Sequence, residues 1–368
     1  MVRSLPRVVP RGGGTKWGLA GGGDGAVVES GGLSGMVEYD PGEFTFTALA
    51  GTPVARVQEL LAAHQQYLPF DPPFVEAGAT LGGVVASGIA GPCRLRFGGV
   101  RDFILGVRFI DGRGELVRGG GRVVKNAAGF DLPKFLCGSL GRMGFIVEVT
   151  FKVFPRPEAF ATVCLPFEEL APAAEAARAL LHSPLEPHAV ELAAASSWSA
   201  VTQNLPAGGE APAAKDGWML AVRVGGPPAA MAPWLTRIQE RVGRRGELLA
   251  GQAEVELWRR LRDLAWIGAD AAAVVRLHTL PTRLVELDSL LAAVGAGRHY
   301  SLGGHVAWAH FDEKPEWDLL AGRLSGLGAA AVVLRGAPPS RVWLAGIPGA
   351  GFWQRVKAAL DPEGRFGG

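Results

Sequence analysis

A run of three glycines between an arginine and a threonine is the first feature of this sequence that could do chemistry. It lies in residues 10–16, PRGGGTK. Successive glycines let neighbouring backbone N–H groups converge, which forms a nest for an anion such as a pyrophosphate. The spacing is neither that of the Rossmann dinucleotide fingerprint nor that of a P-loop. Taken alone, the segment could equally be a plain flexible loop.

Two further glycine-rich segments follow. The second covers residues 76–91, EAGATLGGVVASGIAG, and continues with FGGVRD at 97–102. The third combines KNAAGFD at 125–131 with CGSLGRMGFI at 137–146. Hydroxyl groups among the glycines of the second segment can donate to phosphate and ribose oxygens. The alternatives are close packing of a helix on a sheet for the second segment and an ordinary helix–loop–strand connection for the third.

Polar side chains in the second half offer weaker candidates for catalysis. Arg276 and His278 precede a Leu-Pro pair, and an arginine is the usual bidentate clamp for a carboxylate. Pairing of Arg276 with a surface acid is the plainer alternative. His305 and His310 lie five residues apart on an expected strand, so they would point to opposite faces. We therefore expect interface or partly buried histidines there, and no metal site.

The composition excludes several classes of protein. Lysine plus arginine number 37 and aspartate plus glutamate 35, a balance that argues against a dedicated nucleic-acid surface. The three cysteines have no CxxC spacing, which argues against zinc and iron–sulfur sites and is typical of a reducing cytoplasm. No apolar stretch predicts a membrane span or a signal peptide. Of 53 glycines, 30 lie in residues 1–150, so close backbone approach is concentrated there.

The elements that must position these residues follow from periodicity and turn signals. In the first half we expect strands at 8–10, 26–28 and 143–154, a helix within 53–68, a small-residue helix within 75–92 and a hairpin around Asp111-Gly112. In the second half, expected helices cover 168–181, 229–242, 252–265 and 282–294, and expected strands cover 189–193, 218–224, 273–278 and 331–335. This alternation predicts an antiparallel sheet with helices on one face.

The order of the three glycine-rich segments resembles the FAD-binding domain of the vanillyl-alcohol oxidase and p-cresol methylhydroxylase (PCMH) type. Within that superfamily, the chain most resembles the FAD-binding E subunits of bacterial glycolate oxidases. This likeness rests on residues 10–16, AGP at 90–92, VRDFILG at 100–106 and VKNAAGFD at 124–131. The implied fold class is α+β: a two-subdomain FAD-binding domain at 1–157, an α+β cap domain with an antiparallel sheet at 158–350, and a C-terminal helix and tail at 351–368.

The resemblance implies a set of FAD-binding residues. These are Pro10, Arg11, Gly12, Gly13, Gly14, Thr15, Gly78, Thr80, Leu81, Gly82, Gly83, Ser87, Gly88, Gly98, Lys125, Gly129, Asp131, Gly141, Gly144 and Ile146. Members that bind FAD covalently through this loop carry histidine where this chain has Thr15, so non-covalent FAD is expected. The related catalytic subunits carry a Gly-Asp-Gly-Asn metal motif in the cap, and its Asp-Gly-Asn core is absent from residues 303–310.

The implied activity is oxidation of glycolate to glyoxylate, with electrons passing through FAD. The implied partners are a catalytic FAD subunit and an iron–sulfur subunit, in the cytoplasm or held at a membrane through those subunits. One alternative is a stand-alone FAD-dependent oxidoreductase of another small hydroxy acid or alcohol. A non-catalytic flavin or structural subunit, a cell-wall reductase and a scaffold without FAD are the others.

Overall fold

The computed structural model describes residues 2–20, 25–121, 130–206, 216–338, 341–346 and 349–367. Near the N-terminus, β1 (Val8–Arg11) and β2 (Ala26–Glu29) are the two strands that the short apolar runs predicted. They pair as a small parallel sheet. The 3-10 helices η1 (Val2–Ser4) and η2 (Trp17–Ala20) flank β1. The glycine-rich loop therefore begins at the end of β1.

A five-stranded antiparallel sheet follows, in the order β3-β4-β8-β6-β7. Its strands are β3 (Met36–Asp40), β4 (Thr45–Leu49), β6 (Ile104–Ile110), β7 (Leu116–Gly120) and β8 (Phe145–Lys152). β6 and β7 form the predicted hairpin. Asp111 stabilises its turn, because one carboxylate oxygen accepts from the backbone N–H groups of Arg113 and Glu115 at 2.9 Å each.

Short helices cover the five-stranded sheet and enclose a core that includes Phe46, Phe70, Phe103 and Phe151. They are α1 (Val54–Ala62), α2 (Leu81–Ser87), α4 (Val100–Phe103) and α5 (Leu132–Leu136), whereas α3 (Arg94–Phe97) contacts residues 189–194 of the second part. A two-stranded pair, β5 (Gln66–Tyr67) with β9 (Phe154–Pro155), closes this part of the chain. The next strand begins only four residues later, at Ala159.

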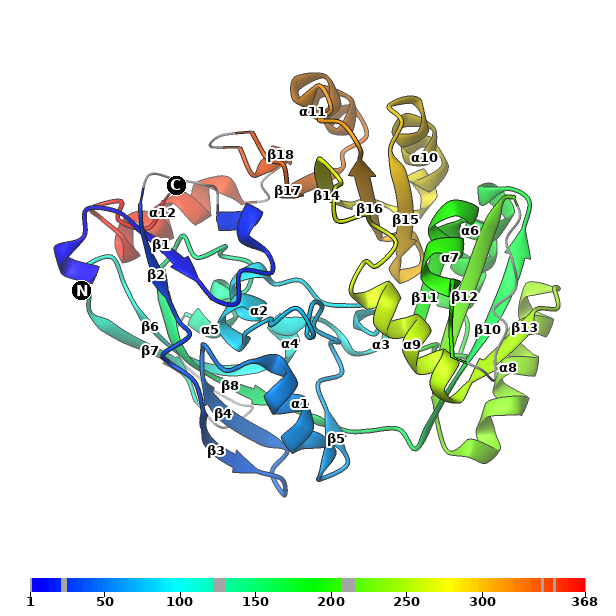
Figure 1. Ribbon diagram of the computed structural model, residues 1–368, viewed down its shortest axis with the longest axis horizontal. Coiled ribbons are helices and arrows are strands. Elements are labelled where there is room, and N and C mark those ends of the chain that lie inside the picture. The colour runs from blue at the N-terminus through cyan, green and yellow to red at the C-terminus, as the bar shows by residue number, and fades with distance from the viewer. Residues whose placement is uncertain are drawn as a thin grey trace.

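The second part is built on a nine-stranded antiparallel sheet, in the order β13-β10-β12-β11-β15-β16-β14-β17-β18 (Figure 1). Its strands are β10 (Ala159–Phe167), β11 (Ala189–Ala194), β12 (Trp218–Gly226), β13 (Glu247–Ala250), β14 (Ala273–His278), β15 (Gly297–Ser301), β16 (Val306–Phe311), β17 (Ala330–Arg335) and β18 (Trp343–Ala345). The four strands predicted here are confirmed as β11, β12, β14 and β17.

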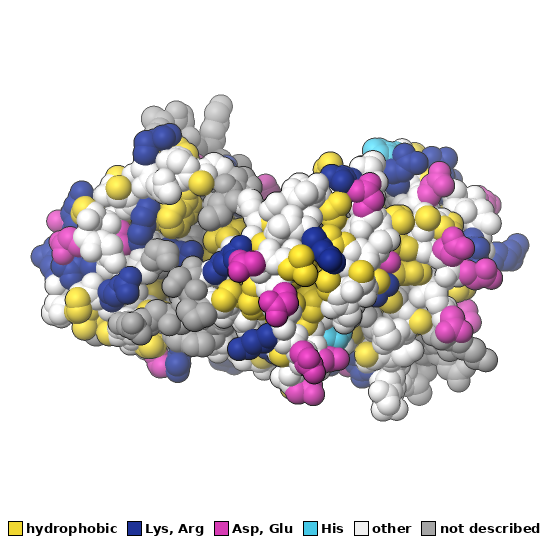
Figure 2. Space-filling view, turned by 90° about the horizontal axis from the view of Figure 1, so that it is seen from above, with side chains coloured by type: hydrophobic (Ala, Val, Ile, Leu, Met, Phe, Trp, Pro, Cys, Tyr) yellow, Lys and Arg dark blue, Asp and Glu magenta, His cyan; other side chains and the backbone are white. Residues whose placement is uncertain are grey.

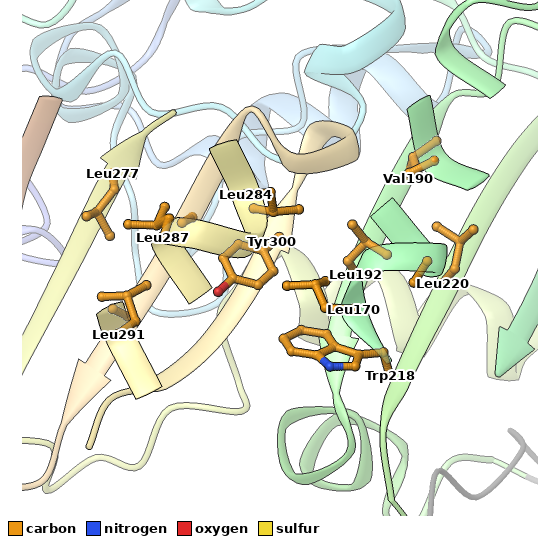
Figure 3. Packing of buried hydrophobic residues seen from close by; sticks show 14 of the residues in the cluster. Leu170, Val190, Leu192, Trp218, Leu220, Leu277, Leu284, Leu287, Leu291 and Tyr300 are labelled. Atoms are coloured by element: carbon orange, nitrogen blue, oxygen red, sulfur yellow. The ribbon is translucent and has the colours of Figure 1, made fainter. Parts of the chain in front are cut away.

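Helices cover both faces of this sheet, so the prediction of one covered face is wrong. One face carries α6 (Leu170–Leu181), α8 (Pro228–Val242), α10 (Leu284–Ala293) and α11 (Trp317–Gly326). The other carries α7 (Ala195–Thr202) and α9 (Gly251–Arg262). Alternate residues of β11 enter different cores: Val190 and Leu192 join the first, and Ala189 and Ala193 the second. In Figure 3, Leu192 lies near Tyr300 and Leu170, and Val190 lies farther along the same strand.

The chain ends beside its beginning (Figure 1). The predicted tail helix is α12 (Ala350–Leu360), and its Trp353 and Leu360 pack against the core of the first part. Lys357 donates to the backbone carbonyl of Arg142 at 2.5 Å. Buried Phe366 forms an isolated parallel β-bridge with Val8. The N-terminal and C-terminal segments therefore pack against each other. Among the described residues, no helix combines the length and apolar character that crossing a membrane requires.

The mixed architecture with antiparallel sheets confirms the predicted α+β fold class. The 3-10 helices η3 (Pro281–Arg283) and η4 (Leu302–Gly304) complete the described elements. On the face shown in Figure 2, basic and acidic side chains are interspersed. This distribution agrees with the near balance of 37 basic and 35 acidic residues in the sequence.

Candidate functional site

The three glycine-rich segments meet around one cavity in the first part of the chain. About 730 Å³ of empty space, part of it open to solvent, lies between the loop after β1, helix α2 and the start of β8. The lining residues are Pro10, Arg11, Gly12, Gly13, Gly14, Thr15, Lys16, Leu19, Ser30, Ala50, Thr80, Gly82, Gly83, Ala86, Ser87, Leu140, Gly141, Gly144, Phe145 and Ile146.

The first glycine loop lies directly against the backbone of the second segment. A Cβ atom on Gly12 would stand 2.3 Å from Oγ1 of Thr80, and one on Gly13 would stand 1.8 Å from the carbonyl oxygen of Gly78. Gly14 has φ +71°, a left-handed conformation that favours glycine. Bare backbone is therefore required for the loop to close one wall of the cavity.

Helix α2 forms the adjoining wall. Thr80 is its N-cap residue, and the Thr80 hydroxyl accepts from the backbone N–H of Gly83 at 3.4 Å. A Cβ atom on Gly82 would stand 2.9 Å from Cβ of Ala50, so the helix begins pressed against the end of β4. Small residues here leave room for a ligand beside the first turn of the helix.

The third segment fastens onto α2 and supplies the remaining wall. Backbone N–H groups of Gly138 and Leu140 donate to carbonyl oxygens of Val85 and Ala86 at 3.0 and 2.8 Å. Gly144 has φ +152°, and a Cβ atom there would stand 2.6 Å from the carbonyl oxygen of Ile110. These contacts place residues 140–146 at the cavity.

Lys16 is the basic side chain held inside this wall. Its ammonium group donates to Oγ1 of Thr15 at 3.1 Å and lies 5.4 Å from the ring centroid of Phe74. Burial lowers the pKa of Lys16 to about 8, and the negative charge of Asp263 partly offsets that effect. Arg11 differs, because it is exposed at the rim and pairs with Glu29 at 2.6 Å.

The structure brings most of the predicted FAD-binding residues to this cavity, but not all. Gly78 lies behind Gly13, and Leu81 is fully buried in the core. Gly88 is the left-handed C-cap of α2, and Gly98 lies against Asp102. Asp131 caps α5 and pairs with Lys134 at 2.9 Å. The predicted positions that lie outside the described residues are Lys125 and Gly129.

Several lining residues were absent from the predicted set. They are Lys16, Leu19, Ser30, Ala50, Ala86, Leu140 and Phe145. Lys16, Ala86, Leu140 and Phe145 lie inside the glycine-rich segments, so their position in the motif was an available signal. Ser30 and Ala50 carry no such signal, because strand pairing alone brings them to the cavity.

A second, smaller cavity of about 340 Å³ lies where residues 89–92 of the first part meet the nine-stranded sheet. Arg276 of β14 lines it and is buried, and its Nη1 atom lies 2.6 Å from Nε2 of His278. The Arg276 guanidinium lies 5.5 Å from the ring centroid of Trp308, and its Nε has no hydrogen-bond partner. Among the described residues, no carboxylate forms an ion pair with Arg276. Arg276 is thus a buried cation in the lining of this cavity, without an ion pair to a described carboxylate.

Burial and nearby cations set the protonation of this pair. Burial, reinforced by the charge of Arg94, lowers the pKa of Arg276 to about 9. Burial, followed by the charges of Arg276 and Arg94, lowers the pKa of His278 to about 3, so His278 is neutral at pH 7. This arrangement suits binding of an anion more than proton transfer by His278.

The other two histidines singled out in the sequence lie elsewhere. His305 follows η4 and lines a different surface groove, and its Nδ1 lies 2.8 Å from the carbonyl oxygen of Leu302. His310 lies on β16 with its ring against Trp266. Within the described ranges, no group of three or more His, Cys, Asp and Glu side chains could hold a metal ion. The structure therefore does not bring His305 together with Arg276.

The residues of the larger cavity fit a phosphate-containing cofactor. Backbone N–H groups of three consecutive glycines and the hydroxyl of Thr80 provide donors for anionic and ribose oxygens, and Lys16 adds a positive charge to the lining. Residues 3–120 match the protein family described as FAD binding domain. This stretch of the chain is an FAD binding domain. The cofactor predicted from the glycine-rich segments is thereby confirmed as FAD.

Curated relatives extend this comparison along the chain. Over 125 residues the chain is 48% identical to "Glycolate oxidase subunit GlcE" of Escherichia coli (strain K12). The aligned region covers 34% of this chain and 36% of that protein. It is 28% identical over 188 residues to "Glycolate oxidase subunit GlcD" of Bacillus subtilis (strain 168), covering 50% and 39%. It is 31% identical over 192 residues to "D-lactate dehydrogenase" of Archaeoglobus fulgidus, covering 50% and 42%. The chain thus spans between 36% and 42% of the length of these relatives.

Solved structures share the fold over nearly the whole chain. Two crystal forms of alkyldihydroxyacetonephosphate synthase superpose with TM-scores of 0.66 and 0.69. The match covers 97% of this chain and 72% and 71% of those chains, at 16% and 18% sequence identity. At this identity the likeness concerns architecture alone, because one fold hosts many functions.

Proposed function

We propose that this chain is the FAD-binding subunit of a glycolate oxidase-type complex that oxidises a 2-hydroxy acid to a 2-oxo acid. The observation that carries the proposal is the glycine-lined cavity, and a second cavity that contains buried Arg276 borders the same apolar cluster. The 48% identity to a glycolate oxidase subunit supports the choice of complex. The redox chemistry is supplied by FAD when it is bound, and the chain supplies binding, orientation and charge.

The chain's own residues divide this work between the two cavities. Backbone N–H groups of residues 12–14 would hold the pyrophosphate, and the hydroxyl of Thr80 would bind an oxygen of the cofactor. Arg276 binds the substrate carboxylate in the second cavity, where burial strengthens the interaction. FAD is bound non-covalently, because Thr15 stands where covalent members of the superfamily carry the histidine that forms the bond to the flavin.

The partners we propose are a catalytic FAD subunit and an iron–sulfur subunit. The similarity to two differently named glycolate oxidase subunits supports assembly with a related flavin chain. We place the chain in the cytoplasm, and its three cysteines are free. Contact with a membrane then depends on the partner subunits.

Purification of the chain with its native partners tests this proposal. We expect two flavin-bearing chains and iron in one complex, and reduction of the flavin when glycolate is added. A chain that purifies alone with flavin and oxidises glycolate by itself would contradict the subunit assignment. That result would favour a stand-alone oxidoreductase, which Arg276 also suits because the second cavity lies wholly within this chain.

A further inference from the structure

The cavity of the first part has two chemically different ends. At one end, Leu19 and Leu140 pack with the apolar cluster that faces the nine-stranded sheet. At the other end, Phe145 belongs to a separate cluster with Val8 and Val28. The cavity therefore lies between the N-terminal sheet and the second part of the chain.

The second cavity borders the same apolar cluster as the sheet-facing end. Ile89, Leu302 and Trp308 line that cavity and belong to the cluster that contains Leu19. Electron transfer requires the redox-active ring to lie close to the substrate. On the proposed function, the flavin ring accordingly occupies the end of the cavity that carries Leu19 and Lys16.

Lys16 is a cation with little compensation at this end. The acid that acts on it is Asp263 of the second part, whose carboxylate already accepts from Arg262 at 2.8 and 2.9 Å and from the backbone N–H of Phe74 at 2.6 Å. Among the described residues, no carboxylate forms an ion pair with Lys16. Its remaining contacts are the hydroxyl of Thr15 and the ring of Phe74.

We propose that Lys16 supplies the positive charge that favours electron transfer onto the flavin. A partly buried cation is screened less by solvent than one on the surface, so it interacts more strongly with added negative charge nearby. Reduced flavin carries more negative charge than oxidised flavin, so the cation raises its midpoint potential. This inference rests on the proposed function for the orientation of FAD, and on Lys16 itself for the charge.

Two lysine variants and a matched control test the inference in the full chain reconstituted with FAD. Lys16→Met removes the charge, and Lys16→Arg keeps it. Lys152→Met is the control, because Lys152 also lies over an aromatic ring, 4.9 Å from the centroid of Phe103, but outside the cavity. The readouts are the dissociation constant of FAD and the midpoint potential measured by dye equilibration, and neither needs substrate.

For Lys16→Met we expect at least a tenfold lower equilibrium constant for two-electron reduction, which corresponds to about 30 mV. Lys16→Arg and Lys152→Met should keep the wild-type potential. An unchanged potential in Lys16→Met overturns the inference, and weaker FAD binding at constant potential would assign the lysine to the phosphates instead. If the wild-type chain takes up no FAD, the proposed function itself fails.

Discussion

Gly13 and Gly78 are in such close approach that a Cβ atom on residue 13 would stand 1.8 Å from the Gly78 carbonyl oxygen. Gly13→Ala must therefore move the loop away from the second glycine segment. We expect FAD to bind at least tenfold more weakly, because the donors of the loop no longer converge. Gly32→Ala is the control, since a Cβ atom there meets nothing within 4 Å. Titration of the apo chain with FAD measures both, and wild-type affinity in Gly13→Ala would contradict the cavity assignment.

We propose that Thr15 leaves FAD without a covalent link to this loop. A threonine hydroxyl does not form the histidyl bond used by covalent members, and the three cysteines are absent from the residues that line the cavity. We expect acid or detergent denaturation to release all the flavin into the filtrate. Absorption of the denatured chain after filtration is the measurement. Yellow colour that stays with the polypeptide would show that a covalent link exists.

A buried ion pair stabilises the side of the nine-stranded sheet covered by α9. Arg223 of β12 donates from Nε and Nη2 to Glu254 of α9 at 2.8 and 3.2 Å, and both side chains are buried. Glu254→Gln leaves the guanidinium without its counter-ion, which costs about 3–5 kcal/mol of unfolding free energy. Glu175→Gln, in an exposed pair with Arg178, should cost less than about 1 kcal/mol. Urea denaturation of both variants compares them, and equal losses would argue against a desolvated pair.

Acid should destabilise the protein through His188. Burial, followed by the charges of Arg96 and Arg223, lowers the pKa of His188 from its usual 6.5 to about 3. Between these two values the unfolded chain binds a proton that the folded chain does not, so stability falls as the pH falls below about 6.5. The expected loss from this group is about 2 kcal/mol at pH 5.

His188→Phe tests that loss without removing the ring. The imidazole lies edge-on to Phe97, Phe160 and Trp234, with centroid distances of 5.2, 5.8 and 6.3 Å. A phenyl ring suits these neighbours and does not bind a proton. The unfolding free energy measured from pH 7 to pH 5 should therefore fall less steeply in the variant. An identical slope in both proteins would mean that His188 contributes nothing to the acid sensitivity.

Local signals predicted much of this fold, and long-range pairing explains what they missed. Asp111 and the glycine that follows specify a hairpin within a few residues, so the turn was predictable. Ala50 reaches the cavity only because β4 pairs with β8, about 100 residues away. β15 was not predicted, since His299 looks polar in sequence and becomes buried only through Glu191, 2.6 Å from its Nε2.

The covered second face was missed for a related reason. Every residue of β12 from Trp218 to Gly225 is buried, and such continuous burial marks a strand covered on both sides. The sequence of β12, WMLAVRVGG, interrupts its apolar run with Arg223, which hid this pattern. The guanidinium is accommodated there only because α9 brings Glu254 to it.

The uncompensated charge of Arg276 predicts opposite effects on stability and activity. Its guanidinium is buried with an unpartnered Nε and forms no ion pair with a described carboxylate, so holding it charged opposes folding. Arg276→Met should raise the unfolding free energy by about 1–4 kcal/mol and abolish reduction of the flavin by the 2-hydroxy acid. Arg298→Met is the control, because Arg298 has Asp288 as a partner and its loss should destabilise the chain. Urea denaturation and anaerobic flavin reduction measure the two effects. Lower stability with normal flavin reduction in Arg276→Met would show that this arginine maintains the fold and does not bind substrate.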